Sequence, residues 1–415
     1  MNTLITLEVT TLEALRVLVN MLTFTSLVNR QYDQMFGQEG AKVGSIAYAR
    51  VPPKYIVREG AVAQPQGSTE TRVPIKLTKL IGIDLPFSEV ERKLSLDNYS
   101  KNFLVPVMAK LANKIDNDGM KQYRNIYNTV GVLGTVPSKS TTPDANDTYL
   151  GVGVKLDNMA APQDEQRAMV VTPAMQAKLV AANLASFNPS GVISDAFRKG
   201  RFGKGVLGFD WFMDQNCATH KEGTRTGTNG TTWQVSGAQT GSSLLCKAFT
   251  SGNTINAGDT FQIGTLAAGT GVQSVNPQSL EATGELQDFV CTAPVTVAAD
   301  GTVTIPISPA IITSGADQTV DQAAPADAVL TFNAASGKVG RVGLGFHRDA
   351  FTLVTAPLML PKGVHESYYA GDDQTGMGVR IVTAYDIHSN DMLTRHDILY
   401  DWTTLRAELG CRLHA

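Results

Sequence analysis

The sequence predicts an α+β fold in which an all-β segment is inserted into a host of mixed helices and strands. Residues 10–36 and 97–127 carry apolar side chains at spacings of three and four, which is typical of amphipathic helices. Residues 71–85 alternate apolar and polar side chains, the pattern of a half-buried strand. Residues 228–336 are rich in Thr, Val and Gly with frequent turn signals, which predicts many short strands.

The composition excludes several broad classes of protein. The chain has 415 residues, and its 35 Lys and Arg against 38 Asp and Glu leave a formal net charge of −3. This length suits two to three domains, and 43% hydrophobic residues exclude a chain that is disordered throughout. A dedicated DNA-binding protein would carry a strong basic excess. The 38 glycines and only 18% charged residues instead suggest a surface that is partly covered by copies of the same chain.

The first element is expected to be an amphipathic helix over residues 10–36. Thr10 and Glu13 have the spacing of a capping box. The apolar stripe that follows consists of Leu12, Leu15, Val19 and Leu22. Neither a signal peptide nor a membrane span is expected, because acidic residues stand where a signal peptide is positive and polar residues interrupt the apolar stretch.

A two-stranded arm is expected between residues 41 and 85. Its strands would be VGSIAYARVPPKYIV and TRVPIKLTKLIGIDL, joined by the polar tip REGAVAQPQGST. An isolated hairpin is only marginally stable in water, so the arm is expected to lie on another surface. In the second run the apolar residues stand at odd positions, namely Val73, Ile75, Leu77, Ile81, Ile83 and Leu85.

The best helical region is expected from residue 88 to residue 127, in two pieces. Pro106 should kink or restart the second piece, because proline lacks a backbone donor and clashes with the preceding turn. The apolar stripe of this helix is Leu104, Met108, Leu111 and Ile115. Further along, MVVTPAMQAKLVAANL (residues 169–184) predicts a strand that runs into a helix.

A change of composition marks the insert. From Thr228 to Ser336 there is one basic residue, Lys247, against eight acidic ones, so the segment has a net charge of −7 and the remainder +4. After it, GVRIVTAYDIHSNDMLTRHDILYDW predicts a hairpin that turns at Ser389 and Asn390. The insert is therefore expected to lie within the host domain. Its acidic residues are Asp259, Glu281, Glu285, Asp288, Asp300, Asp317, Asp321 and Asp327.

Two short motifs have the spacing of ligand sites, and in both the context favours another explanation. GKGVLG (residues 203–208) matches G-x-G-x-x-G, but it lacks the strand before and the helix after that dinucleotide binding requires. Cys217 with His220 and Cys411 with His414 could close a tetrahedral zinc site, but no C-x-x-C supports it. The sparse, irregular cysteines fit a reducing compartment.

Two histidines stand near carboxylates and could act as general bases. They are His347 near Asp349 and His396 near Asp397. No serine or cysteine stands in a nucleophile context such as G-x-S-x-G, so structural hydrogen bonding is the expected role. We therefore expect a protein that is not an enzyme, with no catalytic residue, no cofactor and no metal site.

The arm carries the candidate functional residues. From Ala41 to Leu80 there are seven basic residues against Glu59 and Glu70. A solvated face is the usual role of such a run. Complementarity to an acidic surface on a neighbouring copy is the functional interpretation, and nucleic-acid contact is a third possibility. The expected intersubunit contacts are Lys42, Arg50, Lys54, Arg58, Arg72 and Lys76.

The order of these elements resembles a known family. The segments that carry the resemblance are MAKLANKID, AFRKGRFGKGVLGFDWFMDQN, VSGAQTG, NAGDTFQIG, NPQSLEATGELQDFV, GTVTIPISPAI, GFHRDAFTLVTAPLMLP and RHDILYDW. The chain is similar to the major capsid proteins of tailed double-stranded DNA bacteriophages, whose fold is named after phage Hong Kong ninety-seven. Within them it resembles the coat protein of short-tailed phages of the P-twenty-two type, which carry an inserted β domain.

The resemblance implies a division of the chain and no enzyme activity. It implies an N-terminal arm helix in residues 1–40, an extended loop in 41–87, a peripheral domain with a long spine helix in 88–135, the first part of an axial domain in 136–222, an inserted β domain in 223–337, the second part of the axial domain in 338–373, and peripheral-domain strands in 374–415.

The function that the resemblance implies is that of a major capsid protein. Hundreds of copies would self-assemble as hexamers and pentamers into an icosahedral shell around the double-stranded DNA genome, with a scaffolding protein and a portal protein. The DNA would be enclosed without sequence-specific binding, no membrane would be involved, and the virion capsid would be assembled in the host bacterial cytoplasm. Two alternatives stay open: a hydrolase-type enzyme using His347 and Asp349, and a β-rich tail or adhesin protein.

Overall fold

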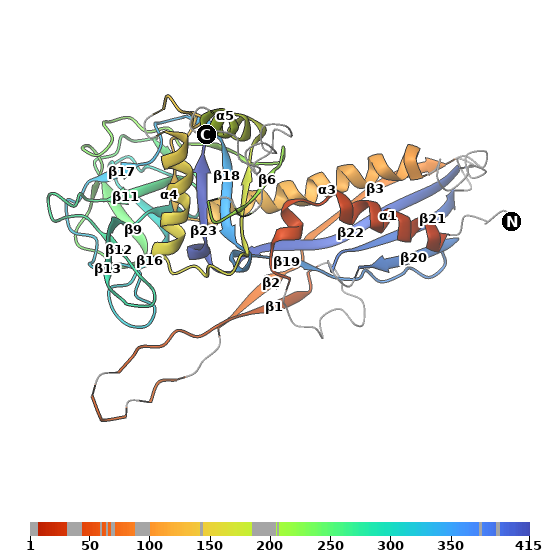
Figure 1. Ribbon diagram of the computed structural model, residues 1–415, viewed down its shortest axis with the longest axis horizontal. Helices are drawn as coiled ribbons and strands as arrows, with labels where there is room; N and C mark the ends of the chain where they lie inside the picture. Colours follow the sequence, from red (N-terminus) through yellow and green to blue (C-terminus); the bar gives the residue numbers. More distant parts are fainter. Residues whose placement is uncertain are drawn as a thin grey trace. The chain divides into compact units, whose positions relative to one another are not determined.

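A computed structural model shows an α+β chain, as predicted from the sequence (Figure 1). It forms two compact units, which are described separately. The first comprises Met1–Pro52, Thr69–Gly119 and Phe351–Leu405, and the second comprises Pro53–Ser68, Met120–Ala350 and Arg406–Ala415. The structure describes residues 7–30, 44–58, 60–63, 65–67, 71–87, 100–141, 144–184, 205, 207–372, 376–386 and 391–415.

An antiparallel sheet organises the first unit, and its longest strand, β22, pairs with β3, β19 and β21. The pairing of β21 with β22 confirms the predicted hairpin, whose turn residues Ser389 and Asn390 lie outside the described residues. The strands are β3 (Lys79–Phe87), β19 (Phe351–Thr355), β20 (Glu366–Gly371), β21 (Gly378–Asp386) and β22 (Asp391–Thr404).

The N-terminal helix is shorter than expected. Helix α1 (Leu7–Met21) packs against β20 and β21, and a 3-10 turn η1 (Phe24–Leu27) follows it. The predicted capping box is wrong, because the helix starts before Thr10 and Glu13 instead pairs with Arg16 at 2.6 Å. The chain turns at Thr23, whose backbone N–H donates to Asp116 of the long helix at 2.8 Å.

The long helix restarts at its proline, as predicted. A π-helical segment η3 (Ser100–Leu104) precedes α3 (Val105–Met120), so Pro106 lies in the first turn of α3, where its missing N–H costs little. The predicted stripe is confirmed, since Leu104, Met108, Leu111 and Ile115 are each at most 3% exposed. The first helical piece predicted from residue 88 lies outside the described residues.

The arm is shorter than predicted, because its second run contains two strands. Strands β1 (Ile46–Val51) and β2 (Thr71–Lys76) form an antiparallel hairpin. At Thr78 the backbone N–H donates to Asp401 at 3.1 Å, and from Lys79 onward the chain pairs with β22 instead of β1. The predicted alternation holds in both strands, because the odd positions from Val73 to Leu85 are buried or half-buried and the even ones are exposed.

The second unit is built on a mixed sheet in the order β4-β23-β18-β5-β6, with β7 also pairing to β18. The predicted passage from strand to helix is confirmed by β5 and α5. The strands are β4 (Thr129–Val130), β5 (Arg167–Val171), β6 (Asp210–Met213), β7 (Thr219–Lys221), β18 (Val339–His347) and β23 (Gly410–His414). The helices are η4 (Lys121–Asn125), α4 (Ala145–Asn158), α5 (Pro173–Leu184), η5 (Arg348–Ala350) and η6 (Ala407–Leu409).

Residues 223–337 form strands and turns around an apolar cluster of their own, which includes Trp233, Phe261 and Phe289. Their main sheet has the order β17-β11-β14-β16-β9-β8. The strands are β8 (Gln234–Val235), β9 (Gly241–Lys247), β10 (Thr254–Ile255), β11 (Thr260–Ile263), β12 (Gln273–Val275), β13 (Ala282–Leu286), β14 (Phe289–Cys291), β15 (Val295–Thr296), β16 (Val303–Ile311) and β17 (Leu330–Phe332).

The two ends of this insert lie side by side. The N–H of Gly337 donates to the carbonyl of Gly223 at 3.0 Å, and the N–H of Glu222 donates to Lys338 at 2.9 Å. The strands β7 and β18, which pair with each other, therefore carry the chain out of the host sheet and back into it.

Candidate functional site

The arm hairpin has one buried face and one exposed face. Ala47, Ala49, Ile75 and Leu77 are buried against Val354, Ala356 and Leu399 of the same unit. Because side chains alternate along a strand, the opposite face carries Tyr48, Arg50, Arg72 and Lys76, which are all exposed. Thus, the apolar face anchors the hairpin, and the positively charged face is presented to solvent.

Two arginines stand directly opposite each other on this exposed face. In the hairpin register, Arg50 is the partner of Arg72. Like charges in directly opposed positions destabilise a sheet. The hairpin therefore presents two guanidinium groups side by side on its exposed face.

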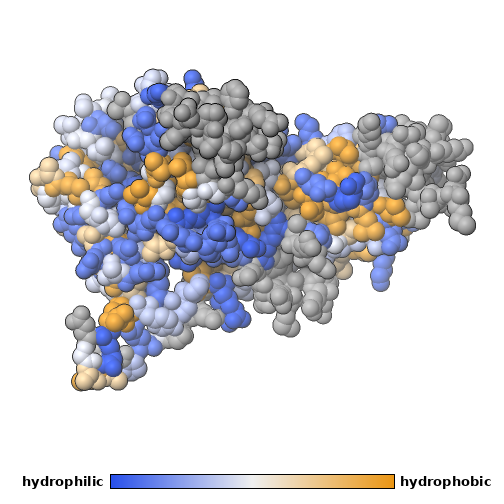
Figure 2. Space-filling model, viewed as in Figure 1, coloured by the Kyte–Doolittle hydropathy of each residue, from blue (hydrophilic) through white to orange (hydrophobic). Residues whose placement is uncertain are grey.

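The tip between the two strands mixes apolar and charged residues, as Figure 2 also shows for this loop. Tyr55, Val57 and Val62 are 57%, 89% and 79% exposed. The guanidinium of Arg58 donates to the carbonyl of Val62 at 2.9 Å and to that of Gly60, so this predicted contact residue also holds the turn of the tip. Lys54 is exposed, and Lys42 lies outside the described residues.

The histidines considered as bases have structural partners. His347 Nε2 lies 3.1 Å from Asp164 and its Nδ1 lies 3.8 Å from Asp349. The side-chain partners of His347 are thus two carboxylates. His396 is fully buried with Nδ1 3.3 Å from the carbonyl of Ile83, and burial lowers its pKa.

The two C-x-x-H pairs do not assemble into one site. Within the described part of the chain, the only cluster of potential metal ligands joins His220 to Glu222 and Asp259, without Cys217, Cys411 or His414. Burial raises the pKa of the Cys217 thiol to about 12 and raises that of Cys411, which disfavours the thiolate that binds metals.

The glycine motif opens a strand. Gly205 and Gly208 have positive φ angles of 69° and 78°, and β6 begins at Asp210. Gly203, Lys204 and Val206 of the motif lie outside the described residues. A turn followed by a strand matches the expected alternative to a dinucleotide-binding loop.

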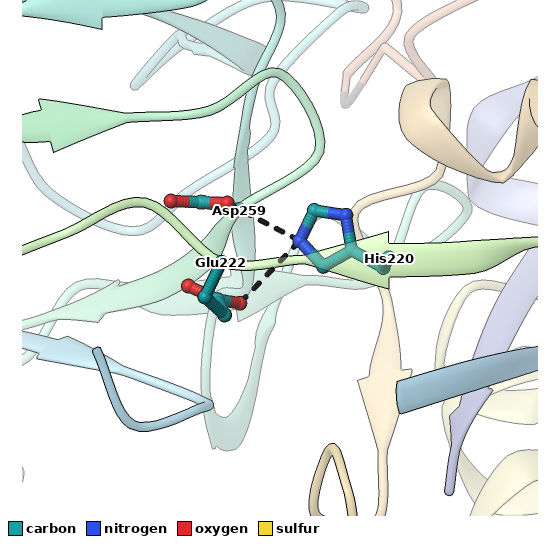
Figure 3. Close-up of side chains that lie close together, drawn as sticks. All are labelled: His220, Glu222 and Asp259. Atoms are coloured by element: carbon teal, nitrogen blue, oxygen red, sulfur yellow. Dashed lines mark ion pairs between the residues drawn. The ribbon is translucent and has the colours of Figure 1, made fainter. Parts of the chain in front are cut away.

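A buried charge cluster lies at the base of the insert (Figure 3). His220 of β7 lies 3.2 Å from Asp259 and 3.5 Å from Glu222. Arg225 donates to both carboxylates, each at 2.8 Å, and all four side chains are at most 3% exposed. Burial alone would lower the pKa of His220, but the carboxylates of Asp259 and Glu222 outweigh it and raise that pKa. Sequence reasoning found His220 through its C-x-x-H motif but missed the other three residues.

Arg412 connects the C-terminal strand to the same region. Its fully buried guanidinium donates to the carbonyls of Ile126 at 2.6 Å, Arg124 at 3.3 Å and Gly258. Burial lowers the pKa of Arg412 to about 10. One side chain of β23 thereby binds two further backbone segments of the second unit, residues 124–126 and Gly258.

Comparison with known proteins decides the family. The model of the family described as P22 coat protein, gene protein 5, matches residues 67–414. The chain belongs to the P22 coat protein family. As a coat protein it is a structural major capsid protein of a tailed phage, a component of the virion that assembles with copies of itself into a shell. No curated protein matches the chain.

Several solved structures resemble this coat protein. A structure of Mycobacterium phage Che8 has a TM-score of 0.47 and 13% identity, over 94% of this chain and 90% of that one. The capsid of cyanophage P-SCSP1u has a TM-score of 0.42 and 11% identity, over 95% and 88%. The capsid of Ralstonia phage GP4 has a TM-score of 0.43 and 8% identity, over 95% and 88%. The family assignment rests on the family model alone.

No helix in the described ranges is both long enough and apolar enough to span a membrane.

Proposed function

We propose that residues 41–87 of this coat protein form an intersubunit arm, and that Lys42, Arg50, Lys54, Arg58, Arg72 and Lys76 contact an acidic surface of a neighbouring copy. The observation that carries the proposal is the two-faced hairpin, whose apolar face is buried in its own unit while its exposed face sets Arg50 opposite Arg72. An anionic partner surface would complement these two positive charges.

Repetition makes weak contacts sufficient. An exposed ion pair contributes only about 0–1 kcal/mol. Every copy in a closed shell repeats the same contact, so the total becomes large and the contacts reinforce one another. The exposed Tyr55, Val57 and Val62 of the tip add apolar area that a protein surface can bury.

The remaining assignments extend this proposal. We assign residues 1–40 to an N-terminal arm, 88–135 and 374–415 to a peripheral domain, 136–222 and 338–373 to an axial domain, and 223–337 to the inserted domain. Hexamers and pentamers would assemble in the host cytoplasm with a scaffolding protein and a portal protein. Family membership supports these assignments, and the net charge of −3 suits a shell that encloses DNA without sequence-specific binding.

Neutralising the arm tests the proposal. The variant Arg50→Gln, Lys54→Gln, Arg58→Gln should fold as a monomer with unchanged circular dichroism, and should fail to form closed shells in negative-stain microscopy. Because Arg58 also holds the tip, the double variant Arg50→Gln, Lys54→Gln separates lost charge from a disturbed turn.

A matched control removes the same charge elsewhere. Lys139, Lys178 and Lys338 are exposed residues outside the arm, and their replacement by Gln should leave shells intact. Normal shells from both arm variants would overturn the proposal. So would an equal loss of shells in the control, because the effect would then belong to net charge and not to the arm.

A further inference from the structure

Three buried atoms at the base of the insert point toward one another without hydrogen-bond partners. They are His220 Nε2, Glu222 Oε1 and Asp259 Oδ1, and within the described part of the chain none of them has a partner with hydrogen-bond geometry. Their side chains are at most 3% exposed. Figure 3 shows the imidazole directed between the two carboxylates. Buried polar atoms are normally satisfied, so this convergence requires an explanation.

The other oxygen of each carboxylate is fully engaged. Asp259 Oδ2 accepts hydrogen bonds from the N–H groups of Gly223 at 3.0 Å and Asn256 at 3.1 Å, and from Arg225 at 2.8 Å. Glu222 Oε2 accepts from Arg225 at 2.8 Å. These donors thus hold the outer oxygens, and both inner oxygens face His220. The carboxylates are fixed in orientation before anything binds between them.

The distances from His220 Nε2 to the two carboxylate oxygens are compatible with a shared metal ion. A charge-assisted N–H···O bond is about 2.7–2.9 Å long, whereas Nε2 lies 3.2 Å from Asp259 Oδ1 and 3.5 Å from Glu222 Oε1. In a tetrahedral zinc site with bonds of about 2.0–2.1 Å, neighbouring ligand atoms are about 3.4 Å apart. The two observed distances bracket this value.

We propose that His220, Glu222 and Asp259 form a binding site for a first-row transition-metal dication, zinc by preference, at the base of the inserted segment. Imidazole and carboxylate are both zinc ligands, and three protein ligands leave one position for water.

A second layer of contacts orients the ligands. The Tyr123 hydroxyl lies 3.0 Å from His220 Nδ1, so Nδ1–H can donate to Tyr123 while Nε2 keeps its lone pair for the metal. Metal-binding histidines commonly use their second nitrogen in this way, and contacts of this kind tune affinity. Arg225 plays the same part for the two carboxylates.

The site would connect the neck of the insert to its sheet. Glu222 directly follows β7, which pairs with the host strand β18, while Asp259 directly precedes β11 of the insert. A metal bound only by the folded chain stabilises it by mass action. The proposed ion would therefore stabilise the second unit and is independent of the charged arm.

The first test uses the full-length wild-type coat protein. After chelator treatment and dialysis against zinc, elemental analysis should give about one zinc per chain, and chelation should lower the unfolding temperature. Cobalt(II) bound to nitrogen and oxygen ligands in a four-coordinate site should absorb in the visible region. The proposal would be overturned by less than a tenth of an equivalent of zinc per chain together with an unfolding temperature that chelator does not change. The cluster would then be an ion pair between protonated His220 and the carboxylates.

A variant locates the metal. His220→Gln should weaken zinc binding at least tenfold, measured by competition with a chromophoric chelator. His347→Gln is the matched control, because His347 is also buried beside two carboxylates, Asp164 and Asp349, and this variant should bind zinc like the wild type. Unchanged affinity in His220→Gln would place the metal elsewhere and overturn the assignment. If His220→Gln does not fold, the zinc content of the wild type and the effect of chelator on its unfolding temperature still test the proposal.

Discussion

Asp116 accepts a hydrogen bond of 3.0 Å from the backbone N–H of Thr25, and both residues are buried. The same carboxylate also accepts from the N–H of Thr23 at 2.8 Å. One side chain of α3 therefore satisfies two N–H groups that follow α1, and it fixes the path of the N-terminal segment within the first unit.

Removing this carboxylate should loosen the N-terminal segment. Asp116→Ala leaves two backbone N–H groups without their acceptor, and we expect the first unit to lose about 1.5–3 kcal/mol. Amide exchange at Thr23 and Thr25 should accelerate in the monomer. Lys110→Ala, an exposed change on the same helix, serves as the control. Unaltered exchange at both amides in the Asp116 variant would contradict the prediction.

Two helical glycines should respond oppositely to alanine. A Cβ at Gly119 would lie 2.7 Å from ring atoms of Phe24 and Trp402, whereas a Cβ at Gly153 would meet only Phe209, at 3.7 Å. We expect Gly119→Ala to destabilise by about 1–3 kcal/mol through overpacking. Gly153→Ala should stabilise by up to about 1 kcal/mol through helix propensity. Urea unfolding of the monomers measures the change in unfolding free energy for each variant. Changes of the same sign in Gly119→Ala and Gly153→Ala would contradict the prediction.

Acid should weaken the first unit through His396. Burial lowers its pKa below the usual 6.5, so the folded chain holds it neutral while the unfolded chain binds a proton. Its stabilising contribution is complete above pH 6.5 and is lost as the pH falls below that value, with a slope of at most about 1.4 kcal/mol per pH unit. Stability measured from pH 7.5 to 5.5 should fall less steeply in His396→Gln. If the stability of the wild type and that of His396→Gln fall equally steeply with pH, His396 does not have this role.

Reversing one charge should separate folding from assembly. Arg72→Glu places an acid opposite Arg50, and an opposed pair of unlike charges adds roughly 0.2–1 kcal/mol to a hairpin. We expect the monomer to become slightly more stable and shell assembly, followed by light scattering, to become slower. Arg72→Gln removes the repulsion without adding an attraction. Its stability and its assembly rate should therefore lie between those of the wild type and those of Arg72→Glu. Assembly of Arg72→Glu at the wild-type rate would count against the arm as a contact surface.

Local periodicity predicted much of the fold. The odd-position alternation marked Ile75 and Leu77 as buried, and the stripe in the long helix marked Met108 and Ile115, because both patterns depend only on neighbours along the chain. The restart of that helix at Pro106 follows from the missing N–H of proline. Such features need no knowledge of tertiary contacts.

Features decided by distant partners could not be predicted in this way. The end of α1 depends on Asp116, about ninety residues away, and the break between β2 and β3 depends on Asp401. The charge cluster could not be predicted, because Asp259 is one of eight acidic residues of the insert and nothing near it in the sequence indicates that it meets His220. Only the fold brings these groups together.

The hydrogen bond between Gly337 and Gly223 also bears on how this family can change over evolution. The backbone leaves the host sheet and re-enters it through one pair of adjacent strands, β7 and β18. The entropy of closing a loop rises slowly with its length, so the segment between those strands can grow, shrink or be exchanged while the register of the host strands is kept. A foreign domain whose termini lie equally close together could be grafted at the same two glycines.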